Sequence, residues 1–307
     1  MSTLPADAVP HIHTEKVFAG LSDFQRALSS HMDWLRNWYS AVLNWGEPTA
    51  CLPLEHDACS FSAWLNGADA SLIGSFAGFA VLGELHDEVH ATAENITSRA
   101  AAGHTITTSD YEAMMALVLA FGTAAQNLER EVWRTLATVD PLTGLGNRQT
   151  MMSQLVGERD RALRLNQPCC IGLCDVDHFK KVNDSHGHST GDRVLREVAD
   201  CLRGAVRPYD ILYRYGGEEF LVCLPAATLE DGGHVLERMR AAVEDLRVLD
   251  RNGTPFKVTA TFGVTMLSAD QSVEESLERA DNALYDGKRA GRNRVSFYSD
   301  DGRDVDI

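Results

Sequence analysis

Two short acidic segments of the sequence could together bind a metal ion. Asp175 and Asp177 end an apolar run that is typical of a buried strand, and Gly216-Gly217-Glu218-Glu219 directly precedes another such run. Glycines at a turn tolerate positive φ and leave no side chain in the way. Carboxylate oxygens suit Mg²⁺, which also takes substrate phosphates as ligands. Together the segments predict a nucleoside triphosphate site for phosphoryl transfer, whereas either one alone is more often an ordinary turn.

A second set of residues has the types that bind zinc. His86 and His90 are four positions apart, so on a helix they project from one face and could share a metal. With His31 and Cys59 they would supply three imidazoles and one thiolate, which satisfy a tetrahedral Zn²⁺ ion. A helical region with many histidines also contains such pairs by accident, and for His86 and His90 alone that alternative is favoured.

The segments that carry these residues differ in periodicity. Before residue 140, apolar residues recur at helical spacing, as at Leu21, Phe24 and Leu28, and this pattern is typical of a four-helix-bundle-like domain. After residue 140, short apolar runs alternate with helical stretches, which indicates an α/β domain. We expect its strands at 170–176, 220–224 and 257–264.

The segment 111–139 connects the two regions. Its apolar residues recur mostly every three or four positions, and the resulting narrow stripe suits pairing with another helix. A bundle helix that covers its own core explains the first half equally well, whereas the second half leads directly into the next domain and favours a signalling stalk. The expected parts are a flexible N-terminus (1–14), a helical domain (15–130), a helical stalk (131–139), an α/β domain (140–298) and a flexible acidic tail (299–307).

Composition restricts the class of protein. The chain of 307 residues has a net charge of −16, which argues against a nucleic-acid partner because phosphate binding needs clustered Lys and Arg. No segment approaches the roughly 20 apolar residues of a membrane span, and Met1 to Pro10 lack the pattern of a secretory signal. The 7 cysteines do not look like a disulfide framework. We therefore expect a cytoplasmic protein without membrane insertion.

Five motifs occur in order along the second region. They are an entry motif at 140–148, the Asp-x-Asp segment at 175–184, the segment 187–192, the signature at 216–220 in its Gly-Gly-Glu-Glu-Phe form, and a closing motif at 280–293. Together they resemble the GGDEF family of diguanylate cyclases over residues 137–298. The resemblance implies a central mixed β-sheet flanked by helices, similar to the palm of nucleotidyl cyclases. It also implies an enzyme that condenses two GTP into cyclic di-GMP and two pyrophosphates. Each domain would hold one GTP, so catalysis would require a homodimer.

The resemblance assigns roles to single residues. Those that resemble the family's Mg²⁺ (or Mn²⁺) ligands are Asp175, the carbonyl of Val176, and Glu218. Glu218 would also help to deprotonate the attacking ribose 3′-hydroxyl, and Glu219 is the second candidate for base or metal ligand. The residues that resemble GTP-binding positions are Asn183 and Asp192 for guanine, His188 for a further substrate contact, and Lys180, Lys288 and Arg292 for the phosphates.

A second site on the same domain is implied upstream of the signature. Arg207 and Asp210, together with Arg238, resemble the family's Arg-x-x-Asp site, where cyclic di-GMP binds as product and inhibitor. A guanidinium can bind a guanine edge or a phosphate through two hydrogen bonds, and a carboxylate can accept from guanine nitrogens. By itself the tetrapeptide fits a solvated surface turn, but its offset from the signature favours product inhibition.

The histidine and cysteine set also resembles a known domain. His31, Cys59, His86 and His90, with their flanking tryptophans, are similar to the chemoreceptor zinc-binding domain over residues 20–130. That family usually has Gly where Ser62 stands. A closed four-ligand site leaves no position for a substrate water, so we expect zinc to regulate the enzyme rather than to catalyse. The helix ending at Val139 would pass the signal to the cyclase dimer.

Two functions from other classes are alternatives. A receptor would bind cyclic di-GMP without making it, and a zinc-binding or interaction protein would carry a vestigial cyclase. Intact Asp175, Glu218, Asn183 and Lys180 argue against both. A change of substrate to ATP is disfavoured because Asn183 and Asp192 both suit guanine.

Overall fold

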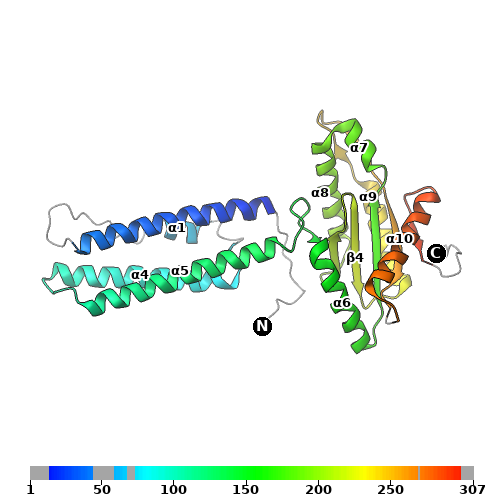
Figure 1. Ribbon diagram of the computed structural model, residues 1–307. Coiled ribbons are helices and arrows are strands. Elements are labelled where there is room, and N and C mark those ends of the chain that lie inside the picture. The colour runs from blue at the N-terminus through cyan, green and yellow to red at the C-terminus, as the bar shows by residue number, and fades with distance from the viewer. Residues whose placement is uncertain (1–13, 44–58, 68–72, 269, 299–307) are drawn as a thin grey trace. The chain divides into compact units, whose positions relative to one another are not determined.

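The computed structural model describes residues 14–43, 59–67, 73–268 and 270–298, which divide into two compact units (Figure 1). A helical unit extends to Ala137, and a sheet unit begins at Thr138. The predicted tail 299–307 and, except for Thr14, the predicted N-terminal segment 1–14 lie outside the described residues. Within the described ranges, no helix is both long enough and apolar enough to cross a membrane.

The described helical unit is built around one apolar core. Its helices are α1 (Thr14–Leu43), α2 (Ser60–Asn66), α4 (Ala77–Ala101) and α5 (Thr108–Leu136). Phe24 of α1, Leu82 of α4 and Phe121 of α5 are fully buried, as expected for three helices that turn their apolar faces inward. Helix α5 begins at a capping box in which Thr107 and Asp110 each accept a hydrogen bond from the other's backbone N–H.

Helix α5 ends three positions earlier than predicted. The sequence predicted a helix as far as Val139, but the last helical residue is Leu136. The next residues belong to the sheet unit: the Thr138 carbonyl accepts from the Asn147 N–H at 2.9 Å, and Val139 forms an antiparallel bridge with Gly146. Because the Thr138 carbonyl and the Val139 backbone pair with Asn147 and Gly146, they cannot form the hydrogen bonds of a further helical turn.

The sheet unit has a six-stranded sheet in the order β1-β3-β4-β2-β7-β8. The strands β2, β4, β7 and β3 pair antiparallel, whereas β1–β3 and β7–β8 pair parallel, so the sheet is mixed as predicted. The bounds are β1 Gly146–Asn147, β2 Cys169–Val176, β3 Ile211–Arg214, β4 Glu219–Pro225, β7 Ala260–Met266 and β8 Val295–Phe297. A separate hairpin joins β5 (Val248–Leu249) to β6 (Pro255–Phe256).

Helices cover both faces of this sheet. Helices α8 (His188–Gly204) and α9 (Leu229–Asp245) share a core with Cys170 and Cys174 of β2. Helices α6 (Arg148–Leu165) and α10 (Val273–Arg289) share the other core with Cys169 and Ile171. Strand β2 is thus buried along its whole length, which explains its continuous apolar run. The third predicted strand begins at Ala260 rather than 257.

Candidate functional site

The register of β2 and β4 brings the predicted acidic residues to one edge of the sheet. Asp175 is the pairing partner of Glu219, and the Val176 N–H donates to the Glu218 carbonyl at 3.1 Å. Asp175 is buried, and the two glutamates are half-buried. The backbone pairing therefore fixes three carboxylates near one another at the point where β2 ends.

Lack of space, rather than positive φ, explains Gly216 in the signature turn, whereas it does not explain Gly217. The sequence predicted that Gly216 and Gly217 permit positive φ and leave no side chain in the way, but neither has a positive φ. A Cβ at Gly216 would overlap the Glu219 carboxylate, whereas a Cβ at Gly217 would meet open space. The turn is closed by the Tyr215 and Gly216 N–H groups, which donate to the Glu219 carbonyl at 2.9 and 3.2 Å.

Arg214 fixes this turn to the entry motif, a role that sequence reasoning missed. Its Nη1 donates to both carboxylate oxygens of Asp140 at 3.1 Å, and its Nη2 donates to the Gly217 carbonyl at 2.7 Å. Asp140 also accepts from the Thr143 N–H and hydroxyl at 2.9 and 2.8 Å. The turn that carries Glu218 is thereby held to the first loop of the sheet unit.

Cations at the end of α10 and just after it lie near the acidic edge. Lys288 Nζ lies 2.8 Å from Asp175 Oδ2. Burial raises the pKa of Asp175, and the Lys288 hydrogen bond and the Arg292 charge offset part of that rise. Burial, followed by the Asp175 charge, raises the pKa values of Glu218 and Glu219. Repelling carboxylates beside cations are suited to a divalent metal with a polyphosphate, and Asp175, Glu218 and the Val176 carbonyl could hold the metal.

The predicted guanine-binding residues meet at the joint between α7 (Phe179–His186) and α8. Asn183 lies against Gly191 so closely that a Cβ there would overlap its Oδ1 atom. Asp192 follows Gly191 on α8, and His188 begins that helix after Gly187, whose φ is 80°. The Asn183 amide thus lies next to the residue that precedes Asp192 on α8. Lys180 is exposed on the first turn of α7.

The predicted product site forms a compact turn after α8. The Arg207 N–H donates to Asp210 Oδ2 at 2.8 Å, and the Asp210 N–H donates to the Arg207 carbonyl at 3.1 Å. Arg238 of α9 donates to the Ala205 carbonyl through Nε and Nη2 at 3.1 and 2.6 Å. Burial raises the pKa of Asp210, while Arg207 and Arg238 oppose the rise, so both cations lie near this carboxylate.

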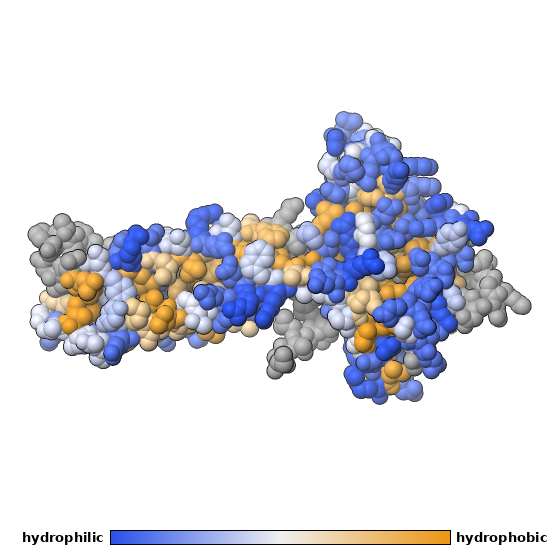
Figure 2. Space-filling model, in the orientation of Figure 1, coloured by the Kyte–Doolittle hydropathy of each residue, from blue (hydrophilic) through white to orange (hydrophobic). Residues whose placement is uncertain are grey.

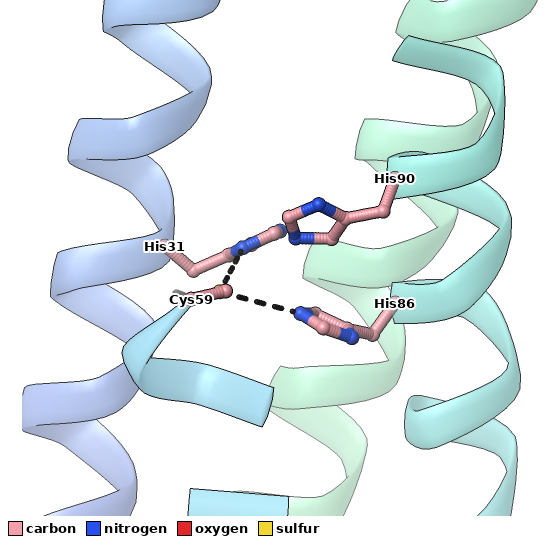
Figure 3. A group of neighbouring side chains, drawn as sticks. All are labelled: His31, Cys59, His86 and His90. Carbon is pink, nitrogen blue, oxygen red and sulfur yellow. Dashed lines mark hydrogen bonds between the residues drawn. The ribbon is translucent and has the colours of Figure 1, made fainter. Parts of the chain in front are cut away.

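In the helical unit, the four predicted zinc ligands converge (Figure 3). His31 comes from α1, Cys59 from the residue before α2, and His86 and His90 from α4; all are buried. Their ligand atoms lie within 4.8 Å of one another, and Cys59 Sγ lies 3.5 Å from both His31 Nδ1 and His86 Nε2. A tetrahedral zinc with bonds of about 2.3 Å to sulfur and about 2.0 Å to nitrogen would separate S and N by about 3.5 Å. The donor set therefore fits such an ion.

The surroundings of this cluster are aromatic. The His31 ring stacks on Trp34 with centroids 5.4 Å apart, and Phe61 and Phe121 lie 5.7 and 4.9 Å from it. His86 Nδ1 lies 3.5 Å from Asp87 Oδ1, the type of outer contact that orients a metal-binding imidazole. An apolar shell excludes water and so strengthens the attraction between a metal and its ligands.

Comparison with known proteins identifies the sheet unit. Residues 137–294 match the family model described as Diguanylate cyclase, GGDEF domain. The chain belongs to the GGDEF family. The diguanylate cyclase DgcP of Pseudomonas aeruginosa is 43% identical over 162 residues, which cover 53% of this chain and 24% of DgcP. The diguanylate cyclase DosC of Escherichia coli is 36% identical, and the match covers 38% of its length. The chain thus spans well under half of these GGDEF relatives.

Other GGDEF proteins match more of the chain. The diguanylate cyclase DgcZ of Escherichia coli is 27% identical over 291 residues, which cover 94% of this chain and 96% of DgcZ. The coiled coil and GGDEF domain of DgcB from Caulobacter crescentus, solved in complex with c-di-GMP, is 33% identical with a TM-score of 0.57, covering 61% and 98% of the two chains. SiaD from Pseudomonas aeruginosa, solved with its activator SiaC, is 33% identical with a TM-score of 0.52, covering 77% and 97%. The mixed sheet flanked by helices is the fold that these GGDEF structures share.

Proposed function

We propose that the whole protein is a diguanylate cyclase that converts two GTP into cyclic di-GMP and two pyrophosphates. The observation that carries the proposal is the acidic edge formed by Asp175, Glu218 and Glu219, with Lys288 beside it. Asn183 and Asp192 would bind guanine, while Lys180, Lys288 and Arg292 would bind the phosphates. A bound Mg²⁺ or Mn²⁺ would neutralise charge on the triphosphate. Glu218 would accept the proton of the 3′-hydroxyl that attacks the α-phosphate, with Glu219 as the second candidate.

Purified protein incubated with GTP and MgCl₂ tests this directly. Chromatography of the nucleotides should give cyclic di-GMP and pyrophosphate, and Asp175→Asn should abolish both. If the protein binds cyclic di-GMP but does not synthesise it, the receptor alternative is established instead. Conversion of ATP but not GTP would overturn the assignment of Asn183 and Asp192.

GTP is abundant in the cytoplasm, and the six cysteines described in the structure are free, so we place the activity in that reducing compartment.

The active form is proposed to be a homodimer, because each sheet unit offers one GTP half-site. Helices α1, α4 and α5 expose large apolar side chains that a second copy could cover: Phe18, Val81, Leu119 and Trp133. Figure 2 shows hydrophobic residues gathered on the visible face of the helical unit. Sedimentation and activity should then depend together on protein concentration, and a fully active monomer would exclude the dimer.

Product inhibition at Arg207 and Asp210 is the second part of the proposal. The exposed Arg207 is available to a ligand, and Arg238 lies close enough to affect the pKa of Asp210. Arg207→Ala should keep the initial rate but lose inhibition by added cyclic di-GMP, because this site is separate from the acidic edge. Equal inhibition of both proteins would remove the role of Arg207.

Zinc regulation through a chemoreceptor zinc-binding type of domain is the third part. The four buried donors, whose ligand atoms lie within 4.8 Å of one another, support it. Zinc binding would change helix packing, and α5 leads along the chain into the entry motif of the sheet unit. Turnover measured across buffered zinc concentrations should change for the wild type and stay constant for His86→Ala. Identical curves for the two proteins would refute the link.

A further inference from the structure

The turn after α10 is held in an unusual backbone conformation. Gly291, Arg292 and Asn293 have consecutive positive φ values of 121°, 66° and 49°. Residues other than glycine rarely adopt this region, and they keep it only where the surroundings fix them. Arg292 is one of the proposed phosphate-binding cations, so whatever fixes this turn also places a charge needed at the acidic edge.

Asp177 contacts this turn from the end of β2. Asp177 is 5% exposed. Oδ2 accepts from the Asn293 N–H at 3.1 Å and from the Thr259 hydroxyl at 2.7 Å, and Oδ1 accepts from the Thr261 hydroxyl at 2.7 Å. Asp177 therefore ties the backbone of the turn to Thr259, just before β7, and to Thr261 of β7, whose hydroxyl also accepts from the Asn293 N–H at 3.1 Å.

A second set of contacts fixes the opposite side of Asn293. Its Oδ1 accepts from Arg240 at 2.8 Å, and its Nδ2 donates to Glu244 at 2.9 Å, both on α9. The Arg292 N–H also donates to the Gly287 carbonyl at 3.0 Å. The turn is thus clamped between α9 and the end of β2, and Asp177 is the contact that reaches it from the acidic edge.

The two aspartates of the Asp-x-Asp segment consequently have different tasks. Asp175 contacts the Lys288 side chain, whereas the oxygens of Asp177 are occupied by three donors within the protein. Those donors and its burial argue against Asp177 as a second metal ligand. We propose that Asp177 is a positioning residue that holds the 291–293 turn so that Arg292 meets the triphosphate. The proposal rests on the proposed cyclase function and deepens it.

A double-mutant cycle with Arg292 tests the proposal in the full-length protein. Asp177→Ala should raise the KM for GTP by about tenfold or more, the size expected for a lost charge-assisted contact, with a smaller change in kcat. Asp177→Asn keeps one acceptor for the Asn293 N–H and should lose less. On the Arg292→Ala background, Asp177→Ala should cause no further loss of kcat/KM. The matched control is Asp200→Asn, an exposed carboxylate on α8, which should behave as the wild type.

The outcomes are separable. Losses that multiply in the double variant would overturn the proposal, because Asp177 would then act independently of Arg292. If Asp177→Ala fails to fold, as judged by circular dichroism, the same cycle is measured with Asp177→Asn. If the wild type makes no cyclic di-GMP, the proposed function fails. The same double-mutant cycle is then measured as binding affinity for a GTP analogue in which a methylene group replaces the oxygen between the α- and β-phosphates. If the wild type is active and the Asp177 variants keep its kinetics and its affinity, the positioning role of Asp177 is refuted while the proposed function stands.

Discussion

At the scale of single residues, the acidic edge is costly to the folded protein when no cation is bound. Burial raises the pKa values of Asp175, Glu218 and Glu219, and the Asp175 charge raises those of both glutamates further. A carboxyl whose pKa is raised by folding makes the folded state less stable once the pH exceeds its unfolded pKa. Such a cluster attracts positive charge, so its presence indicates a site that binds a cation.

Glu218→Gln should separate activity from stability. We expect cyclase activity to fall by at least about 100-fold, because a candidate base and metal ligand is lost. Without magnesium at about pH 8, the variant should melt at a higher temperature than the wild type, because a repelled carboxylate is gone. Below about pH 4 the carboxyl is protonated in both states and the difference should vanish. Calorimetry at both pH values measures this, and a less stable variant at pH 8 would contradict the assigned electrostatics.

Sequence could predict which residues form this edge but not how they are held. Asp175 and Glu218 stand beside apolar runs, and that local pattern is visible without a structure. The Arg214–Asp140 ion pair joins residues 74 positions apart, and the periodicity of the sequence gives no indication of such a contact. The sequence predicted that a glycine at 216 leaves room beside the backbone, but not that the Glu219 side chain occupies that room. The contacts of Asp177 with Asn293 depend on the same tertiary register.

At the scale of elements, the long and regular segments were predictable and the short ones were not. Strands β2 and β4 were placed to within one residue, because buried central strands have continuous apolar runs. Strands β1, β5 and β6 have two residues each, which is too few for any period to appear. The end of α5 was set by hydrogen bonds to the entry loop, which override helix propensity.

Gly191→Ala tests how α8 packs against α7. A methyl group there would overlap the Asn183 side chain and would approach Phe179 Cζ to 3.2 Å, so the guanine-binding amide must move. We expect the KM for GTP to rise by about tenfold or more, as one good hydrogen bond is lost. Gly204→Ala on the same helix meets open space and should leave KM unchanged, with stability raised by up to about 1 kcal/mol. Equal KM values in the two variants would remove Asn183 from the guanine site.

At the scale of the whole molecule, the two units have separate cores and meet along the chain between Ala137 and Thr138. Each unit also has its own proposed ligand, zinc in one and GTP with Mg²⁺ in the other. A ligand that binds only the folded form of one unit stabilises that unit. Because the cores are separate, each binding site can be assigned to a unit by measuring which unfolding transition its ligand shifts to a higher temperature.

Calorimetry of the full chain should accordingly resolve a zinc-dependent transition. Free zinc at about a thousandfold above its Kd would add about 4 kcal/mol to the helical unit and raise its melting temperature on the order of 10 °C. A GTP analogue with Mg²⁺ should move only the other transition. His90→Ala should lose the zinc shift because a buried ligand is missing, whereas His104→Ala, which changes an exposed histidine, should retain it. An equal zinc shift in His90→Ala would show that His90 contributes nothing to zinc binding, because a site left with three protein donors would need a water as its fourth ligand.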